Sequence, residues 1–132
     1  MMQGFVNQNC EAIISIAVGQ ANTPKQMVNA VIDTGFTGFL SLPLSIITTL
    51  GLSWHFRDFG TLGDGSEVIF DMYRAIVIWD GQTKVIDVAA AETEPLVGMS
   101  LLRGYRLQID VVESGLVKIS ALPMLVRSDH IT

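Results

Sequence analysis

The spacing of hydrophobic and polar positions along the chain predicts short β-strands. Runs rich in β-branched residues cover 12–18 and 26–32, and the turn-prone segment 19–25 separates them. This pair is typical of a β-hairpin. Similar strand-like runs follow at short intervals, and we expect further strands over 40–42, 52–59, 66–79, 83–90, 107–111 and 116–119.

The segments between these runs are turns and two short helices. Three glycines in 60–65 predict a mobile hairpin tip, and a tight turn is expected at Asp80-Gly81. Pro43 suits the first turn of a helix over 44–50, and the segment 99–103 has helical character as well. The pattern therefore predicts an all-β protein with one or two short helices.

Composition narrows the class of protein. The chain has 132 residues, 49% of them apolar and 16% charged, which favours one packed domain over 1–132. We expect its core at about 11–121 and a loose tail over 123–132. The net charge is -5. An acidic chain without a cluster of basic residues is a poor partner for nucleic acid, because phosphate binding needs cationic side chains.

Cellular location is predicted from what the sequence lacks. Cys10 is the single cysteine, so no intrachain disulfide can form, which fits a reducing compartment. No apolar run approaches the roughly 20 residues that span a bilayer. The segment 1–10 has neither basic residues nor a long apolar stretch, unlike a secretory signal. We therefore expect a soluble cytoplasmic protein that does not bind membranes.

The most informative position is Asp33, at the end of the apolar run 28–32. An unpaired carboxylate buried there would cost several kcal/mol, so it must be neutralised, paired or used. Taken alone, the tripeptide Asp33-Thr34-Gly35 also fits an ordinary turn after a strand, with Thr34 capping its own backbone.

The segments around this tripeptide resemble the retropepsin-like aspartic proteases, most closely their small single-lobe bacterial members. The resemblance spans about 11–121, and three segments carry it: A-V-I-D-T-G-F-T-G-F-L-S-L-P (30–43), G-T-L-G-D-G-S-E-V (60–68) and L-V-G-M-S-L-L-R-G-Y-R-L-Q-I-D (96–110). It implies a closed, mostly antiparallel β barrel that works as a homodimer.

The resemblance also implies an activity, that of an aspartic endopeptidase. Asp33 would face Asp33 of the partner subunit, and two carboxylates in one site hold a single proton between them. The ionised one would activate a water molecule, and the protonated one would donate to the carbonyl oxygen of a peptide bond. No cofactor or metal is required. The chain contains a single D-[TS]-G, so a pair of such carboxylates needs two chains.

Roles for other residues follow from the same resemblance. The Thr34 hydroxyl would form a hydrogen bond across the dimer axis, and Gly35 would let the backbone of a peptide substrate approach closely. Leu62, Gly63 and Asp64 match the tip of a flap that closes over the substrate. The residues expected to contact the substrate are Phe36, Leu62, Gly63, Asp64, Leu96 and Val97.

One departure leaves a second function open. Position 36 is Phe, where the viral members of the family usually have a small residue, and it offers no hydroxyl to the carboxylate pair. We therefore expect activity at mildly acidic to neutral pH. The alternative is a non-catalytic dimerisation or peptide-binding module on the same fold. A metal site is not expected, since His55 and His130 have no Cys or acid at ligand spacing.

Overall fold

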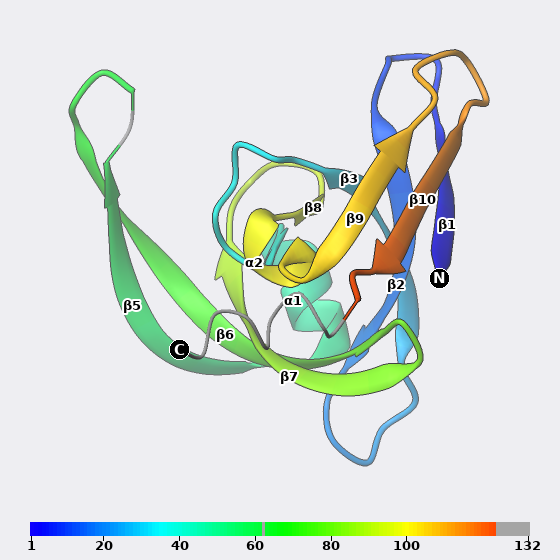
Figure 1. The fold of residues 1–132 in the computed structure, drawn as a ribbon. Coiled ribbons are helices and arrows are strands. Elements are labelled where there is room, and N and C mark those ends of the chain that lie inside the picture. Colours follow the sequence, from blue (N-terminus) through cyan, green and yellow to red (C-terminus); the bar gives the residue numbers. More distant parts are fainter. Residues whose placement is uncertain (62, 124–132) are drawn as a thin grey trace, which may run out of the picture.

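A computed structural model describes residues 1–61 and 63–123 of the chain (Figure 1). Strands dominate the described part, and the two helices are short. In chain order the elements are β1 (Met2–Val6), β2 (Ala12–Gly19), β3 (Gln26–Ile32), β4 (Leu40–Leu42), α1 (Leu44–Leu50), β5 (Ser53–Thr61), β6 (Glu67–Trp79), β7 (Gln82–Ala90), β8 (Leu96–Val97), α2 (Met99–Leu102), β9 (Tyr105–Ile109) and β10 (Leu116–Ala121).

Six of these strands close into a barrel. They pair in the order β6-β7-β4-β8-β3-β2, and β2 pairs back with β6 to complete the ring. Two pairs are parallel, β3 with β8 and β4 with β7, and the remaining pairs are antiparallel. The predicted all-β fold, a closed and mostly antiparallel barrel with two short helices, is confirmed.

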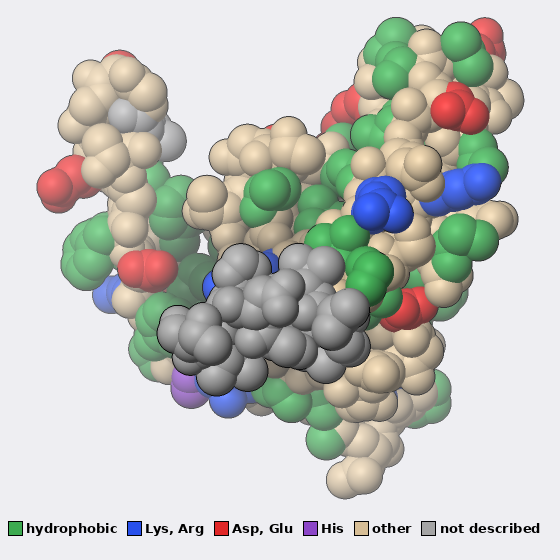
Figure 2. Space-filling model, viewed as in Figure 1, with side chains coloured by type: hydrophobic (Ala, Val, Ile, Leu, Met, Phe, Trp, Pro, Cys, Tyr) green, Lys and Arg blue, Asp and Glu red, His purple; other side chains and the backbone are tan. Residues whose placement is uncertain are grey.

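Two arms extend from the barrel (Figure 1). One is the β5–β6 hairpin, which continues past the part of β6 that pairs with β2 at Ile76–Ile78. A register shift between Trp54 and Phe56 gives this arm an irregular point near its base. The other arm consists of β9, β10, β1 and the start of β2. A hollow separates the two arms on the face shown in Figure 2.

The core follows from strand alternation. In β2, for example, Ile14, Ile16 and Val18 point inward and are at most 2% exposed. Trp79, at the end of β6, is fully buried and meets the ring of Tyr105 edge-on, with 5.9 Å between ring centroids. Side chains from both halves of the chain thus fill one continuous interior.

Most predicted elements agree with the structure to within one or two residues. Helix α1 ends at Gly51, which has φ 67°, and Asp80-Gly81 has φ values of 51° and 76°, as a tight hairpin turn requires. The sequence prediction missed β1, which pairs with β10 and β2. Beyond Pro123, the predicted tail lies outside the described residues.

Neither described helix is long and apolar enough to cross a membrane.

Candidate active site

The floor of the candidate site is a row of side chains that crosses six neighbouring strands. Directly paired residues of a sheet point to the same face, so strand register defines this row. In order from β5 to β3, it consists of Phe56, Met72, Ala89, Ser41, Leu96 and Val31. The first five line a cleft of about 520 Å³.

Strand alternation separates the two residues of β8. Leu96 pairs with Ser41 and Val31 and lines the cleft. Val97 pairs with Leu40 and Ile32, points the opposite way and is 0% exposed. The expectation that the Val97 side chain contacts substrate therefore does not fit the structure, because that side chain belongs to the core.

Asp33 directly follows β3 and is half-buried. It comes two residues after Val31, so it continues the face that carries the floor row. The backbone N–H of Asp33 donates to the carbonyl oxygen of Val97 at 2.9 Å. Its Oδ1 atom accepts a hydrogen bond from the backbone N–H of Gly35, also at 2.9 Å. These two hydrogen bonds orient Asp33 at the end of β3.

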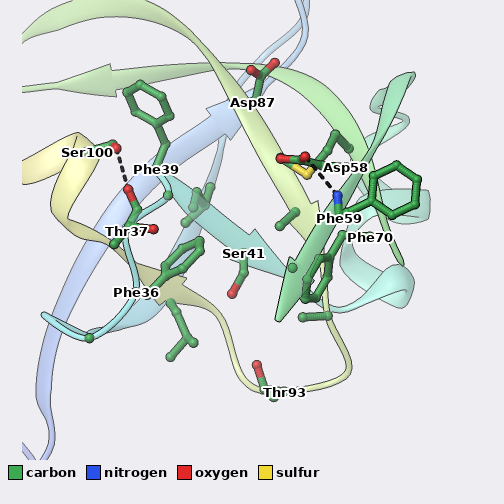
Figure 3. Close-up of a pocket in the computed structure, with 18 of the residues that line it drawn as sticks. Phe36, Thr37, Phe39, Ser41, Asp58, Phe59, Phe70, Asp87, Thr93 and Ser100 are labelled. Carbon is green, nitrogen blue, oxygen red and sulfur yellow. Dashed lines mark hydrogen bonds between the residues drawn. The ribbon is translucent and has the colours of Figure 1, made fainter. Parts of the chain in front are cut away.

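The loop after Asp33 is attached to the start of α2 by main-chain hydrogen bonds. The N–H of Met99 donates to the oxygen of Phe36 at 2.8 Å, and the N–H of Ser100 donates to the oxygen of Gly38 at 3.1 Å. The Ser100 hydroxyl donates to the oxygen of Thr37 (Figure 3). This loop therefore needs α2 to hold its conformation.

Gly98 lets the two segments approach this closely. A Cβ atom on Gly98 would collide with the carbonyl oxygen of Gly38 and would lie 2.6 Å from the ring of Phe36. Its own N–H donates to the oxygen of Phe39 at 3.0 Å. A side chain at position 98 would force the loop away from α2.

Thr34 lies on the other side of this loop. It borders a second hollow of about 320 Å³ together with Met99, Leu102 and Tyr105. Met99 is 47% exposed. The loop therefore has two faces: Gly35 and Phe36 border the cleft, and Thr34 faces a shallow, largely apolar surface beside α2.

The predicted flap tip is the end of the β5–β6 arm. Gly63 and Asp64 are exposed there and do not border the cleft. Leu62 lies outside the described residues. The hydroxyl and the N–H of Ser66 both donate to Asp64 Oδ1, at 2.6 and 2.9 Å, and they hold the pKa of that carboxyl below its usual value.

The walls of the cleft are aromatic. The chain has six phenylalanines, and five of them line this space: Phe36, Phe39, Phe56, Phe59 and Phe70. They come from the Asp33 loop and from the two strands of the arm, so the arm and the loop form opposite walls (Figure 3). Such a lining suits an apolar or flat ligand group.

Two acids also border the cleft. Asp58 accepts a hydrogen bond from the N–H of Phe59 at 2.9 Å. Asp87 Oδ1 accepts no hydrogen bond from the residues that the structure describes, but it lies 3.6 Å from Arg74 Nη2, within ion-pair range. Both carboxylates make the cleft unfavourable for an anionic ligand group.

Within residues 1–61 and 63–123, no three His, Cys, Asp or Glu side chains gather as metal ligands would.

Sequence reasoning identified only part of this site. Of the predicted residues, the structure brings Gly35, Phe36 and Leu96 to the cleft. Asp33 does not line the cleft itself, but it is bound to the cleft residue Gly35 through the hydrogen bond to its Oδ1. The sequence prediction missed Ser41 and the phenylalanines of the arm. Alternation along 70–72 and 40–42 could have shown which side chains share a face of each strand. The pairing of these strands across the barrel, which brings those faces together, was not visible in sequence.

No family model and no curated protein matches the chain. Among solved structures, it is similar to the crystal structure of a retropepsin-like aspartic protease from Rickettsia conorii. The two are 20% identical, the similarity covers 92% of this chain and 91% of the other, and the TM-score is 0.56. At this identity the likeness shows the fold alone, and the fold is retropepsin-like.

Proposed function

We propose that the protein is a homodimeric aspartic endopeptidase. The observation that carries the proposal is the setting of Asp33: a half-buried carboxylate at the end of a barrel strand, bound to Gly35 of a largely apolar cleft, in a loop attached to α2. A rigid loop matters because a catalytic group must be held in a productive geometry before substrate binds.

In this proposal, two Asp33 carboxylates, one from each chain, hold a single proton between them. The ionised carboxylate takes a proton from a water molecule, which attacks the carbonyl carbon of the peptide bond. The protonated carboxyl donates to the carbonyl oxygen, and a tetrahedral intermediate forms. Its collapse breaks the C–N bond and transfers a proton to the leaving nitrogen, and the carboxylate pair again holds one proton.

The surface beside Thr34 supports a dimer. The second D-[TS]-G that the pair needs is absent from the chain, so it must come from another copy. Thr34 and the exposed Met99 border an apolar hollow next to the Asp33 loop, where a second chain could pack. Val111 and Val112 at the β9–β10 turn, 66% and 65% exposed, add apolar surface on the second arm.

The cleft supports a peptide as the substrate. It lies between the Asp33 loop and the β5–β6 arm, and it is long enough to be bordered by residues of five strands. An extended peptide presents alternate side chains to one face, and apolar ones would fit the phenylalanine walls. Gly35 would allow the peptide backbone to approach Asp33.

The test is cleavage of a diverse peptide library by the wild type and by Asp33→Asn, scanned from about pH 4 to pH 7.5. Asparagine can still accept the Gly35 hydrogen bond through its Oδ1, so the variant should fold. Cleavage by the wild type that is at least about 100-fold slower in the variant supports the proposal.

A folded, dimeric wild type that cleaves nothing would contradict the proposal. It would favour the alternative, a peptide-binding or dimerisation module on this fold. Cleavage that persists at the same rate in Asp33→Asn would indicate a contaminating protease.

A further inference from the structure

Ser41 is an unusual residue for its position. It lies in the middle of the floor row, between Ala89 on β7 and Leu96 on β8, and the other members of that row are apolar. It is 3% exposed, and, indole groups aside, it is the only polar side chain buried this deeply in the described part of the chain. Its neighbours in β4, Leu40 and Leu42, point into the core, so alternation directs Ser41 to the cleft.

The hydroxyl of Ser41 has no hydrogen-bond partner among the residues that the structure describes. Leaving such a group unpaired is unfavourable by about 1–3 kcal/mol, whereas an alanine there would carry no such cost. Buried hydroxyls are normally paired, so an unpaired one beside a cavity is available to a hydrogen-bonding group that enters the cavity.

The surroundings of Ser41 define what that ligand group must be. In Figure 3, Ser41 lies between the rings of Phe36 and Phe70. Thr93 also borders this cleft. Ala89, the direct partner of Ser41 on β7, takes up little space on the floor. The space therefore admits a flat or narrow group with apolar sides that reaches down to the hydroxyl.

A charged tip does not fit this position. A cation or an anion next to Ser41 would be buried among aromatic and aliphatic side chains with a single neutral partner, which is costly. Asp58 and Asp87 further along the cleft disfavour an anion as well. A neutral group that donates or accepts a hydrogen bond has neither problem.

We propose that Ser41 determines substrate specificity, by pairing with a neutral hydrogen-bonding group at the tip of a substrate side chain that enters between Phe36 and Phe70; this rests on the proposed peptidase function. Tyrosine matches this description best, because its ring is flat and its hydroxyl is at the far end. The Ser41 hydroxyl is free to turn toward such a group, since it has no hydrogen bond to break.

The direct test uses small probes and needs no hydrolysis. We would titrate N-acetyl-tyrosinamide and N-acetyl-phenylalaninamide into the wild type and into Ser41→Ala, and obtain dissociation constants from NMR shifts of the amides of Phe36 and Leu96. We expect the wild type to bind the tyrosine probe about fivefold to tenfold more tightly. In Ser41→Ala the two probes should bind equally.

Ser45→Ala is the matched control, since Ser45 is exposed on α1 and outside the cleft. It should keep the wild-type preference. Equal affinity of the wild type for both probes, no binding of either, or a preference that survives in Ser41→Ala would overturn the inference.

A cleavage assay separates this inference from the proposed function. A peptide that the wild type cleaves would be prepared with Tyr or Phe at each position in turn. A preference for Tyr in kcat/KM at one position, lost in Ser41→Ala, supports both proposals. Cleavage without any such preference overturns the role of Ser41 and leaves the peptidase intact. A tyrosine preference in the NMR titration of a protein that cleaves nothing would overturn the proposed peptidase and leave the pairing of Ser41 with tyrosine intact.

Discussion

The backbone N–H of Asp33 donates a hydrogen bond to the carbonyl oxygen of Val97, with 2.9 Å between nitrogen and oxygen. This bond joins the end of β3 to β8, a strand from the other half of the chain. The position of the candidate catalytic carboxylate therefore depends on a segment that is remote in sequence. Disturbing either side of this contact should affect both stability and activity.

Gly98→Ala should disturb the attachment of the Asp33 loop to α2. The added Cβ would collide with the oxygen of Gly38, so the loop must move away from α2. We expect a loss of about 1–3 kcal/mol in the free energy of unfolding, with loss of peptide cleavage. Chemical denaturation measures the first and a peptide assay the second. Gly63→Ala is the stability control, since a Cβ there meets nothing within 4 Å. Equal stability of the two variants would show that the close approach is unimportant.

Met99→Glu should weaken the proposed dimer without unfolding the chain. Met99 is 47% exposed in the single chain, so a charge there is tolerated until a partner covers it. Burying one methionine side chain stabilises an interface by about 1.5–3 kcal/mol. Its loss should therefore lower dimer affinity more than tenfold. Sedimentation equilibrium measures this affinity. Met27→Glu, at a 66% exposed methionine on β3, should leave it unchanged. The same affinity in both variants would place the interface elsewhere.

The β5–β6 arm should lose stability in acid through Asp71. Hydrogen bonds from Trp54 Nε1 at 3.1 Å and from Arg57 Nε at 3.2 Å hold the pKa of the Asp71 carboxyl below its usual value. Asp71 therefore binds a proton less readily in the folded state than in the unfolded state. Its stabilising effect is complete at neutral pH and disappears as the pH falls through its folded-state pKa, below about pH 4.

Comparison with Asp71→Asn isolates this effect. The wild type should have the higher Tm at pH 7, and the difference should shrink toward zero near pH 3. Hydrogen exchange should locate the change in the arm and not in the barrel. A Tm difference that does not change with pH would mean that the charge of Asp71 has no role.

Ser41→Ala should not destabilise the protein. The unpaired buried hydroxyl of serine destabilises the fold, and alanine has no such group. The free energy of unfolding should therefore stay equal or rise by up to about 3 kcal/mol, and Tm should not fall. Thermal unfolding measures this. A clear loss of stability would mean that Ser41 already has a structural partner, and it would remove the basis for its role in substrate specificity.

The sequence by itself determined the local structure. The runs rich in β-branched residues over 12–18 and 26–32 favour strands. Gly51 ends α1 with φ 67°, and Asp80-Gly81 adopts the positive φ values of a hairpin turn. These outcomes depend on residues a few positions apart, and such short-range patterns can be read directly. Asp33-Thr34-Gly35 was equally visible, as an abrupt polar end to an apolar run.

Only the tertiary structure decided which strands meet. β1 forms because β10 and β2 lie on either side of it, and its own residues carry little signal. Pairing across the barrel directs Leu96 to the cleft and Val97 to the core, and it brings five phenylalanines to the cleft that Ser41 also lines. Strand register fixes which face each side chain takes, and a shift of one residue would reverse every one of them. That register is set by closure of the barrel, which involves residues far apart in the chain.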